Sequence, residues 1–209
     1  MPAAASILGE YLSGIRARPL ERDIREKALM CLLDTLGLSL SARTEPTTLA
    51  ALALSYDLGT DRDKAATAWA SGARLSASEA AFANGVAAHA HFQDDTDHDS
   101  WTHPGSLVPP AVVALAERDG ASLEATLRGL IAGYSTINWL GREEVVARRL
   151  IARGFRTSPT LGTIAAAAGS AVLLGLDAGK AASAVSIAAS TTGGTLEPVR
   201  AGAEEWRVQ

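Results

Sequence analysis

The chain has 209 residues, of which 47% are hydrophobic and 20% charged, and it carries a formal net charge of -4. This composition excludes a disordered chain, and the length allows one large domain or two small ones with a substantial core. Lysine and arginine are scattered rather than clustered, which argues against a nucleic-acid partner.

Three further features bear on compartment and membrane association. The N-terminus lacks the basic and then apolar pattern of a signal peptide. The most apolar run, residues 163–176, is too short and too rich in alanine and glycine to span a bilayer. Cys31 lies among apolar neighbours, and we expect it to be a buried core thiol, as suits a reducing compartment. These features predict a soluble cytoplasmic protein with no membrane partner.

The first half of the chain is predicted to be helical. Apolar residues recur at helical spacing, so that helices are expected at residues 3–16, 19–41, 49–56 (ending near Gly59) and 76–88. The last of these opens with Ser76 followed by Glu79, the pattern of a capping box. Residues 61–74 are more polar, and we expect a loop there with at most a short extended piece.

The second half continues in the same way. Pro104-Gly105 is strong turn chemistry, and the helix after it is expected to hold Pro109 and Pro110 in its first turn. The helices expected here cover residues 107–117, 122–140, 141–154, 161–174 and 178–189, with irregular chain after Thr191. Because no segment alternates convincingly as a strand would, the predicted fold class is all-α.

Residues 84–110 gather most of the chemistry. They hold all four histidines of the chain and four aspartates interleaved with them: His89, His91, His98, His103, Asp94, Asp95, Asp97 and Asp99. Burying such groups costs several kcal/mol each unless they are paired, so a chain seldom carries them for stability alone. This stretch is therefore the candidate site.

Three interpretations of this stretch compete. The first is a metal site whose ligands would be His89, His91, Asp94, Asp95 and His98. The two-residue spacing of the first two histidines fits a helix end poorly, and the sequence has neither an HExxH nor a Glu-x-x-His pattern. The second is metal-free acid/base catalysis by His103, held rigidly before Pro104. The third is structural, with Asp and Thr side chains capping the next helix.

Several motifs, taken in order, resemble the MmgE/PrpD family. They are Leu33-Asp34-Thr35-Leu36-Gly37, Asn84-Gly85, Ala88-His89, Asp94-Asp95-Thr96, His103-Pro104-Gly105, Pro110-Ala111, Ala132-Gly133-Tyr134, Gly154-Phe155 and Thr160-Leu161-Gly162. The family includes 2-methylcitrate dehydratase, cis-aconitate decarboxylase and iminodisuccinate epimerase. The resemblance implies a large all-helical domain with a smaller α+β lid domain, usually as a homodimer, and no metal or organic cofactor.

The resemblance also implies how the chain is organised and what it does. Residues 1–209 would form the helical domain without its lid, so that the chain is either a fragment or a subunit whose lid comes from a second chain. The implied activity is that of a divergent lyase, such as a dehydratase of 2-methylcitrate or another small hydroxy-polycarboxylate. Decarboxylation or epimerisation in the same family, and a non-catalytic helical subunit, are the alternatives.

The family's functional residues carry over in part. The resemblance makes Asp94, Asp95, Thr96 and His103 catalytic, and His89, Arg156 and Arg207 substrate-binding. Phe92 stands where the family has an aspartate, Arg156 where it has a histidine, and Trp206 where it has a lysine. Arginine suits the bidentate binding of a carboxylate, so the expected partner is a small carboxylic acid.

Overall fold

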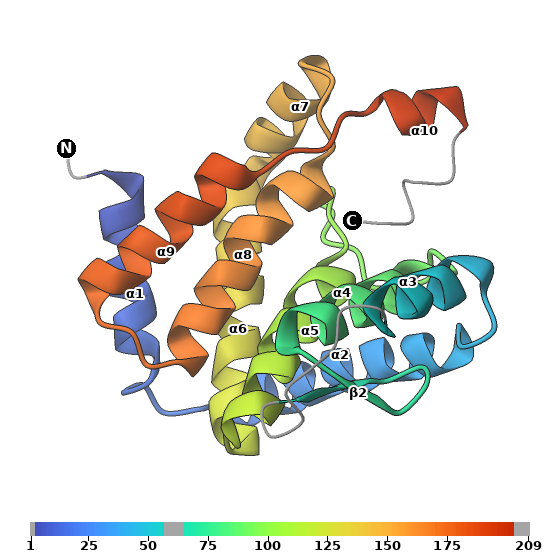
Figure 1. The fold of residues 1–209 in the computed structure, drawn as a ribbon. Helices are drawn as coiled ribbons and strands as arrows, with labels where there is room; N and C mark the ends of the chain where they lie inside the picture. Colours follow the sequence, from blue (N-terminus) through green and yellow to red (C-terminus); the bar gives the residue numbers. More distant parts are fainter. Residues whose placement is uncertain (1–2, 57–64, 203–209) are drawn as a thin grey trace.

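The computed structural model describes residues 3–56 and 65–202, and within them the fold is almost entirely helical (Figure 1). The α-helices are α1 (Ala4–Ile15), α2 (Arg22–Ser41), α3 (Pro46–Tyr56), α4 (Ala77–His89), α5 (Pro104–Asp119), α6 (Leu123–Gly141), α7 (Val145–Ala152), α8 (Thr157–Leu173), α9 (Ala178–Thr191) and α10 (Glu197–Ala201). A 3-10 turn, η2 (Arg142–Glu144), joins α6 to α7. The all-α prediction is confirmed.

α6 and α8 form the centre of the domain. On them pack α1 and α9, around a buried core that includes Leu12, Val172 and Val185 (Figure 1). A second cluster joins α2 and α5 to α6 and α8 around Val112 and Leu127. Each central helix thus buries apolar side chains in both clusters. Apolar residues accordingly occur on more than one face of α6 and of α8.

The two central helices approach each other closely at a pair of glycines. A Cβ atom on Gly129 would lie 3.0 Å from the carbonyl oxygen of Gly169 and 2.8 Å from Cγ1 of Val112. A Cβ atom on Gly169 would lie 2.7 Å from the carbonyl oxygen of Gly129. Any side chain at either position would therefore force α6 and α8 apart.

A small hairpin lies beside α4. β1 (Ala66–Ala68) pairs antiparallel with β2 (Ala73–Leu75), and this is the short extended piece expected between residues 61 and 74, of which residues 61–64 lie outside the described residues. Asn84, buried on α4, donates from its amide to the carbonyl oxygen of Thr67 at 2.9 Å and accepts from the amide of Trp69 at 2.7 Å. Asn84 therefore anchors the hairpin and takes no part in the candidate site.

α5 begins earlier than predicted. Pro104 and Gly105, expected in a turn, form its first residues, because a proline at the first helical position loses no hydrogen bond. Pro109 and Pro110, expected in the first turn, consequently lie inside the helix. Pro109 has no N–H to give to the Gly105 carbonyl four residues back. The hydroxyl of Thr35 on α2 donates to that carbonyl at 3.2 Å instead.

The other helix limits differ from the predictions by a few residues. α2 begins three residues later than expected, whereas α3 and α8 begin three and four residues earlier. The first turns of α3 and α8 are rich in threonine, serine and proline, so that a start placed at the first apolar residue comes too late. The expected end of the third helix near Gly59 lies outside the described residues. Beyond Thr191, predicted to be irregular, the short helix α10 follows.

No helix among the described residues combines the length and the apolar character that a membrane span needs.

Candidate active site around His103

The loop between α4 and α5 is held in shape by its own polar groups. Asp97 and Thr102 form a bridge, with the amide of Asp97 donating to the carbonyl of Thr102 at 2.9 Å. The carboxylate of Asp97 also accepts from the amide of Ser100 at 3.1 Å. Asp97 thus stabilises the loop itself, whereas the expected capping of the next helix is made by Asp95, whose carboxylate accepts from the amide of Gly105 in α5. Exposed His98 and half-buried His91 take no part in the cluster described next.

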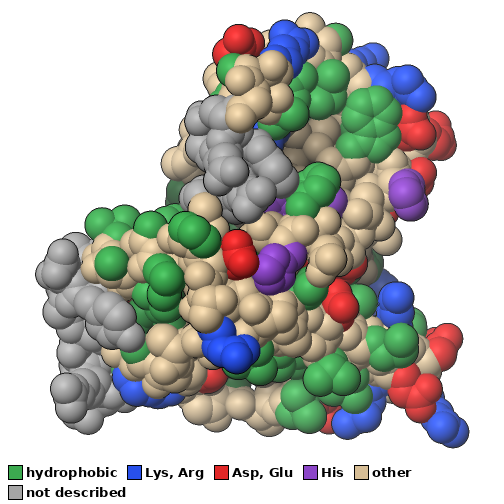
Figure 2. Space-filling view, turned by 90° about the vertical axis from the view of Figure 1, so that its right-hand side faces the viewer, with side chains coloured by type: hydrophobic (Ala, Val, Ile, Leu, Met, Phe, Trp, Pro, Cys, Tyr) green, Lys and Arg blue, Asp and Glu red, His purple; other side chains and the backbone are tan. Residues whose placement is uncertain are grey.

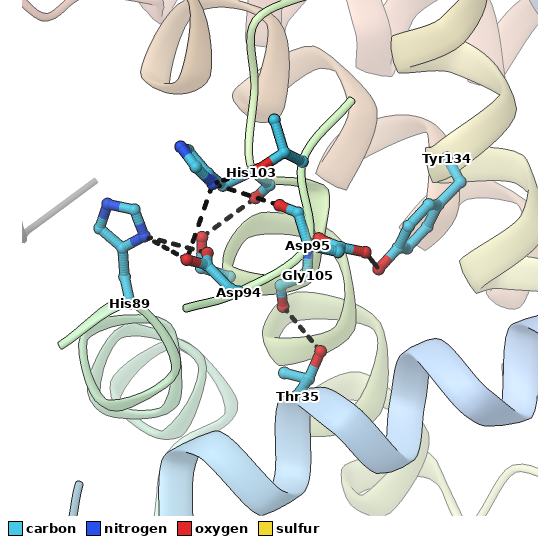
Figure 3. Close-up of polar contacts among 9 residues, drawn as sticks. Thr35, His89, Asp94, Asp95, His103, Gly105 and Tyr134 are labelled. Carbon is cyan, nitrogen blue, oxygen red and sulfur yellow. Dashed lines mark hydrogen bonds and ion pairs between the residues drawn. The ribbon is translucent and has the colours of Figure 1, made fainter. Parts of the chain in front are cut away.

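A buried hydrogen-bonded pair lies at the start of the loop. α4 ends at His89, whose Nδ1 lies 2.9 Å from each carboxylate oxygen of Asp94 (Figure 3). The side chains are 0% and 1% exposed, respectively. Away from water such a pair is stable only with good geometry and further hydrogen bonds. The pair fixes the end of α4 against the loop, so that Asp94 faces the histidines.

His103 lies on the opposite side of Asp94. It precedes Pro104 at the N-terminus of α5, and its side chain is 17% exposed. Its Nδ1 lies 3.2 Å from the carbonyl oxygen of Asp95, 3.7 Å from a carboxylate oxygen of Asp94 and 3.4 Å from Oγ1 of Thr96 (Figure 3). Because a carbonyl oxygen only accepts, we infer that Nδ1 carries the ring proton. A neutral His103 then keeps a lone pair on Nε2, which points away from these oxygens.

Asp95 points away from the histidines. Its carboxylate accepts from the amide of Gly105 at 2.6 Å and from the hydroxyl of Tyr134 on α6 at 2.7 Å (Figure 3). Burial raises the pKa of Asp95 above its ordinary value, although these two hydrogen bonds act in the opposite direction. Burial and the neighbouring Asp95 likewise raise the pKa of Tyr134, which therefore stays protonated as a donor. Asp95 thus ties the first turn of α5 to α6.

The candidate residues divide between two hollows. One, of about 280 Å³, is lined by His103 and Arg156 together with apolar side chains from the loop, α7 and the C-terminal segment. Figure 2 shows histidine and hydrophobic side chains adjoining one another in the middle of one face. The other hollow, of about 520 Å³, lies between α2 and α6 and is lined by Asp95, Thr96 and Lys27 among others.

The prediction that Cys31 is buried in the core is wrong. It is half-buried rather than buried in the core, and it lines the larger hollow. Burial raises the pKa of its thiol, and the nearby Asp95 carboxylate raises it further. The apolar neighbours in sequence were misleading because α2 turns this position toward α6.

Three potential metal ligands come together in the described part of the chain. Ligand atoms of His89, Asp94 and His103 all lie within 4.8 Å of one another. This set differs from the one expected from sequence, because His91 and His98 lie elsewhere. The Nδ1 atoms of both histidines face Asp94 at hydrogen-bonding or ion-pair distance, and that arrangement accounts for the positions of both rings.

The sequence predicted His89, Asp94, Asp95, Thr96 and His103 as site residues. It did not predict the residues from other parts of the chain that contact this loop. Tyr134 and Thr35 lay within recognised motifs, yet no contact with the loop was expected of them. Trp101, to which the sequence assigned no role, lines the hollow beside His103. The Ala132-Gly133-Tyr134 motif was the available signal for Tyr134. Arg207 lies outside the described residues.

Comparison with known proteins agrees with this architecture. Residues 6–209 match the family described as MmgE/PrpD N-terminal domain. Cis-aconitate decarboxylase of Homo sapiens is 30% identical over 189 residues, covering 88% of this chain and 39% of the relative. Cis-aconitate decarboxylase of Mus musculus is 32% identical over 126 residues, covering 59% of this chain and 26% of the relative. This chain thus spans well under half the length of either relative, and it belongs to the MmgE/PrpD family.

Proposed function

We propose that this domain binds a small carboxylic acid in the hollow beside His103 and that His103 transfers a proton to or from it. The observation that carries the proposal is the fixed orientation of His103. Its Nδ1 faces the Asp95 carbonyl and the Asp94 carboxylate, which leaves Nε2 as the nitrogen available to a bound acid. A histidine held in this way can act as a general base and, once protonated, as a general acid.

Asp94 would stabilise the charge that this step creates. When His103 accepts a proton, the imidazolium lies 3.7 Å from a carboxylate that is 1% exposed. A charge pair in such a poorly hydrated place interacts far more strongly than in water. His89 would keep Asp94 in place from the other side, which makes it a positioning residue rather than the substrate-binding residue expected from the sequence.

Arg156 and Thr96 would complete the site. Arg156 lines the same hollow as His103, and its guanidinium suits the planar geometry of a carboxylate. Thr96 places its hydroxyl 3.4 Å from Nδ1 of His103 but lines the larger hollow, so we assign it to positioning the ring. Asp95 acts through its carbonyl and through its hold on α5. Arg207 remains a proposed second carboxylate ligand.

The reaction class follows from these groups. A base beside a bound acid can remove a proton from the carbon next to its carboxylate and give an enolate-like carbanion. Loss of a hydroxyl from the adjacent carbon as water then gives dehydration, as with 2-methylcitrate, whereas reprotonation gives epimerisation. The matched relatives are decarboxylases of cis-aconitate, in which a carbanion left by loss of carbon dioxide would be protonated. We propose dehydration first, with decarboxylation and epimerisation as alternatives.

Hydrogen exchange tests the proposal without assuming the outcome of the reaction. The chain is incubated in D2O with 2-methylcitrate, cis-aconitate or 3-hydroxybutanoate, and proton NMR follows the loss of carbon-bound proton signals. We expect exchange or turnover with at least one acid, and a fall of about 100- to 10,000-fold in His103→Gln.

The matched control is His98→Gln, which changes an exposed histidine of the same loop and should retain the wild-type rate. Equal rates in wild type and His103→Gln would contradict the role of His103. An absence of exchange with every acid would contradict the proposed activity of this chain.

A second candidate function is that of a helical subunit that needs a partner copy. The exposed face of α2 carries Met30, Leu33 and Leu40, which are 63%, 72% and 51% exposed and lie along one side of the helix. Apolar patches of this kind commonly mark protein interfaces. Size-exclusion chromatography with light scattering tests this: wild type should be dimeric and Leu33→Glu monomeric, whereas a monomeric wild type would remove the proposal.

A further inference from the structure

The helix α8 begins at the wall of the hollow beside His103. We propose that its first turn is a carboxylate-binding site, in which the hydroxyl of Ser158 and the amides of Thr157 and Ser158 donate to one carboxylate of the acid. Arg156 lies beside that carboxylate as its counter-ion. This inference rests on the proposed function, and it adds Ser158 to the residues that bind the substrate.

The backbone of the first turn provides two hydrogen-bond donors. The first four N–H groups of an α-helix have no acceptor within the helix. In α8 the amide of Arg156, the N-cap residue, donates to the carbonyl oxygen of Gly194 at 3.0 Å, and Pro159 has no N–H. The amides of Thr157 and Ser158 remain, and neither donates to a residue in the described part of the chain. Both residues line the hollow, so that two adjacent donors lie at its wall.

The side chain of Ser158 is an independent observation. Ser158 is 5% exposed and lines the hollow. Its hydroxyl forms no hydrogen bond with any residue that the structure describes, whereas the hydroxyls of Thr157 and Thr160 donate to the carbonyl oxygens of Trp101 and Arg156. A buried hydroxyl without a partner costs free energy. An acceptor oxygen of a ligand in the hollow would remove that cost.

The surroundings of these donors favour an anion over a neutral ligand. α8 has 17 residues, and its dipole places partial positive charge at its N-terminus. Arg156 lines the same hollow and adds a full positive charge. A carboxylate, with two oxygens that only accept, matches a set of groups that can all donate. Because His103 also lines this hollow, an acid bound here lies in the same hollow as the proposed base.

The start of α8 is fixed to the segments around it. The amide of Leu196 donates to the carbonyl oxygen of Gly154 at 2.7 Å, which holds the C-terminal segment against the residues before α8. The hydroxyl of Thr157 donates to the carbonyl oxygen of Trp101, which joins α8 to the loop that carries His103. Donors that are already held in place lose little conformational freedom upon binding.

Titration calorimetry of the purified chain with 2-methylcitrate and cis-aconitate tests the inference. Ser158→Ala removes a hydrogen bond to a charged group and should weaken the binding of both acids by about 10- to 100-fold. Ser158→Pro removes the amide N–H as well, at a position in the first turn where proline is tolerated, and should bind still more weakly. In the proton-exchange assay, Ser158→Ala should raise the acid concentration needed for half-maximal rate more than it lowers the maximal rate.

The matched control is Ser78→Ala. Ser78 occupies the same second position in α4, but it is exposed, and α4 has its own side-chain cap in Ser76. This variant should bind both acids as wild type does. A further measurement uses wild type alone and therefore does not depend on how the variants fold. In the nitrogen-15-labelled chain, the amide proton signals of Thr157 and Ser158 should move downfield when either acid binds.

The outcomes separate this inference from the proposed function. Unchanged affinity in Ser158→Ala, with exchange still dependent on His103, would overturn the inference and leave the proposed function intact. Amide signals of Thr157 and Ser158 that do not respond to a bound acid would overturn it as well. A loss of the maximal exchange rate in Ser158→Ala at unchanged affinity would contradict a role in binding. Failure of both acids to bind wild type would contradict this inference and the proposed function together.

Discussion

The α6–α8 contact and the loop between α4 and α5 are built on opposite principles. α6 and α8 can approach closely because Gly129 and Gly169 have no side chains, so that each leaves room for the other's carbonyl group. In the loop, shape depends on groups that must be present, since His89 and Asp94 are buried together and hold each other in place. The helix contact should therefore be disturbed by an added side-chain atom, and the loop by the loss of either member of the buried pair.

This difference bears on function because the two regions meet at Asp95. The contact with α8 sets the position of α6, which carries Tyr134. Tyr134 donates to Asp95, which accepts in turn from the first turn of α5. The position of His103, directly before that turn, is thereby set by the helical core as well as by the loop. The following substitutions test the separate contributions of the helix contact and of the loop.

The largest loss of stability is expected from His89→Ala. The substitution leaves the buried carboxyl group of Asp94 without its hydrogen-bonded partner, and breaking a buried pair of this kind typically costs about 3–5 kcal/mol. Asp94 would then keep only the more distant contact with His103. Chemical denaturation measures the loss. The control is His98→Ala, an exposed position, where we expect a change within about 0.5 kcal/mol. Similar values for both variants would show that the buried pair does not hold the loop.

Gly129→Ala should follow, with a loss of about 1–3 kcal/mol. The new Cβ atom would lie 2.8 Å from Val112 and 3.0 Å from the Gly169 carbonyl, so that α6 and α8 must move apart. Gly37→Ala is the matched control, because nothing lies within 4 Å of its Cβ position on α2. That substitution should raise the melting temperature, by the helix propensity of alanine over glycine. A neutral Gly129→Ala would mean that the helix contact adapts more readily than inferred.

Tyr134→Phe should have a smaller effect, of about 1 kcal/mol, because it removes one hydrogen bond and leaves the ring in place. Its second consequence is more informative. With Asp95 held only by Gly105, the first turn of α5 loosens and the exchange rate catalysed by His103 should fall more than the affinity for the acid. An unchanged rate would show that the helical core does not position His103.

The smallest effect is a dependence of stability on pH. Burial raises the pKa of Asp95 in the folded chain above 3.8, so the protonated carboxyl is favoured there. Its contribution is fully present below pH 3.8 and is lost as pH rises through the raised value. Asp95→Asn mimics the protonated form and keeps groups that can bond Gly105 and Tyr134. Its stability relative to wild type should therefore grow as pH rises from about 4 toward neutrality. A constant difference in denaturation experiments across this range would contradict the raised pKa.

Much of this architecture could be predicted from sequence because it is local. Helical spacing and the Ser76–Glu79 capping box depend on residues within one or two turns, and both are confirmed. The density of histidine and aspartate likewise identified the loop. The opposite orientations of Asp94 and Asp95 could not be predicted, since they depend on Tyr134, which is 39 residues away from Asp95. Nor could the role of Thr35, whose partner Gly105 is 70 residues away.

The most direct test of the central claim is the protonation of the two ring nitrogens of His103. Long-range proton–nitrogen NMR of the labelled chain distinguishes them, and His103→Gln assigns the signals. We predict that the neutral ring carries its proton on Nδ1, and that adding 2-methylcitrate shifts the Nε2 signal in wild type but not in Arg156→Gln. A ring protonated on Nε2, or an Nε2 signal indifferent to every acid that binds, would contradict the proposal that His103 faces its substrate as a base.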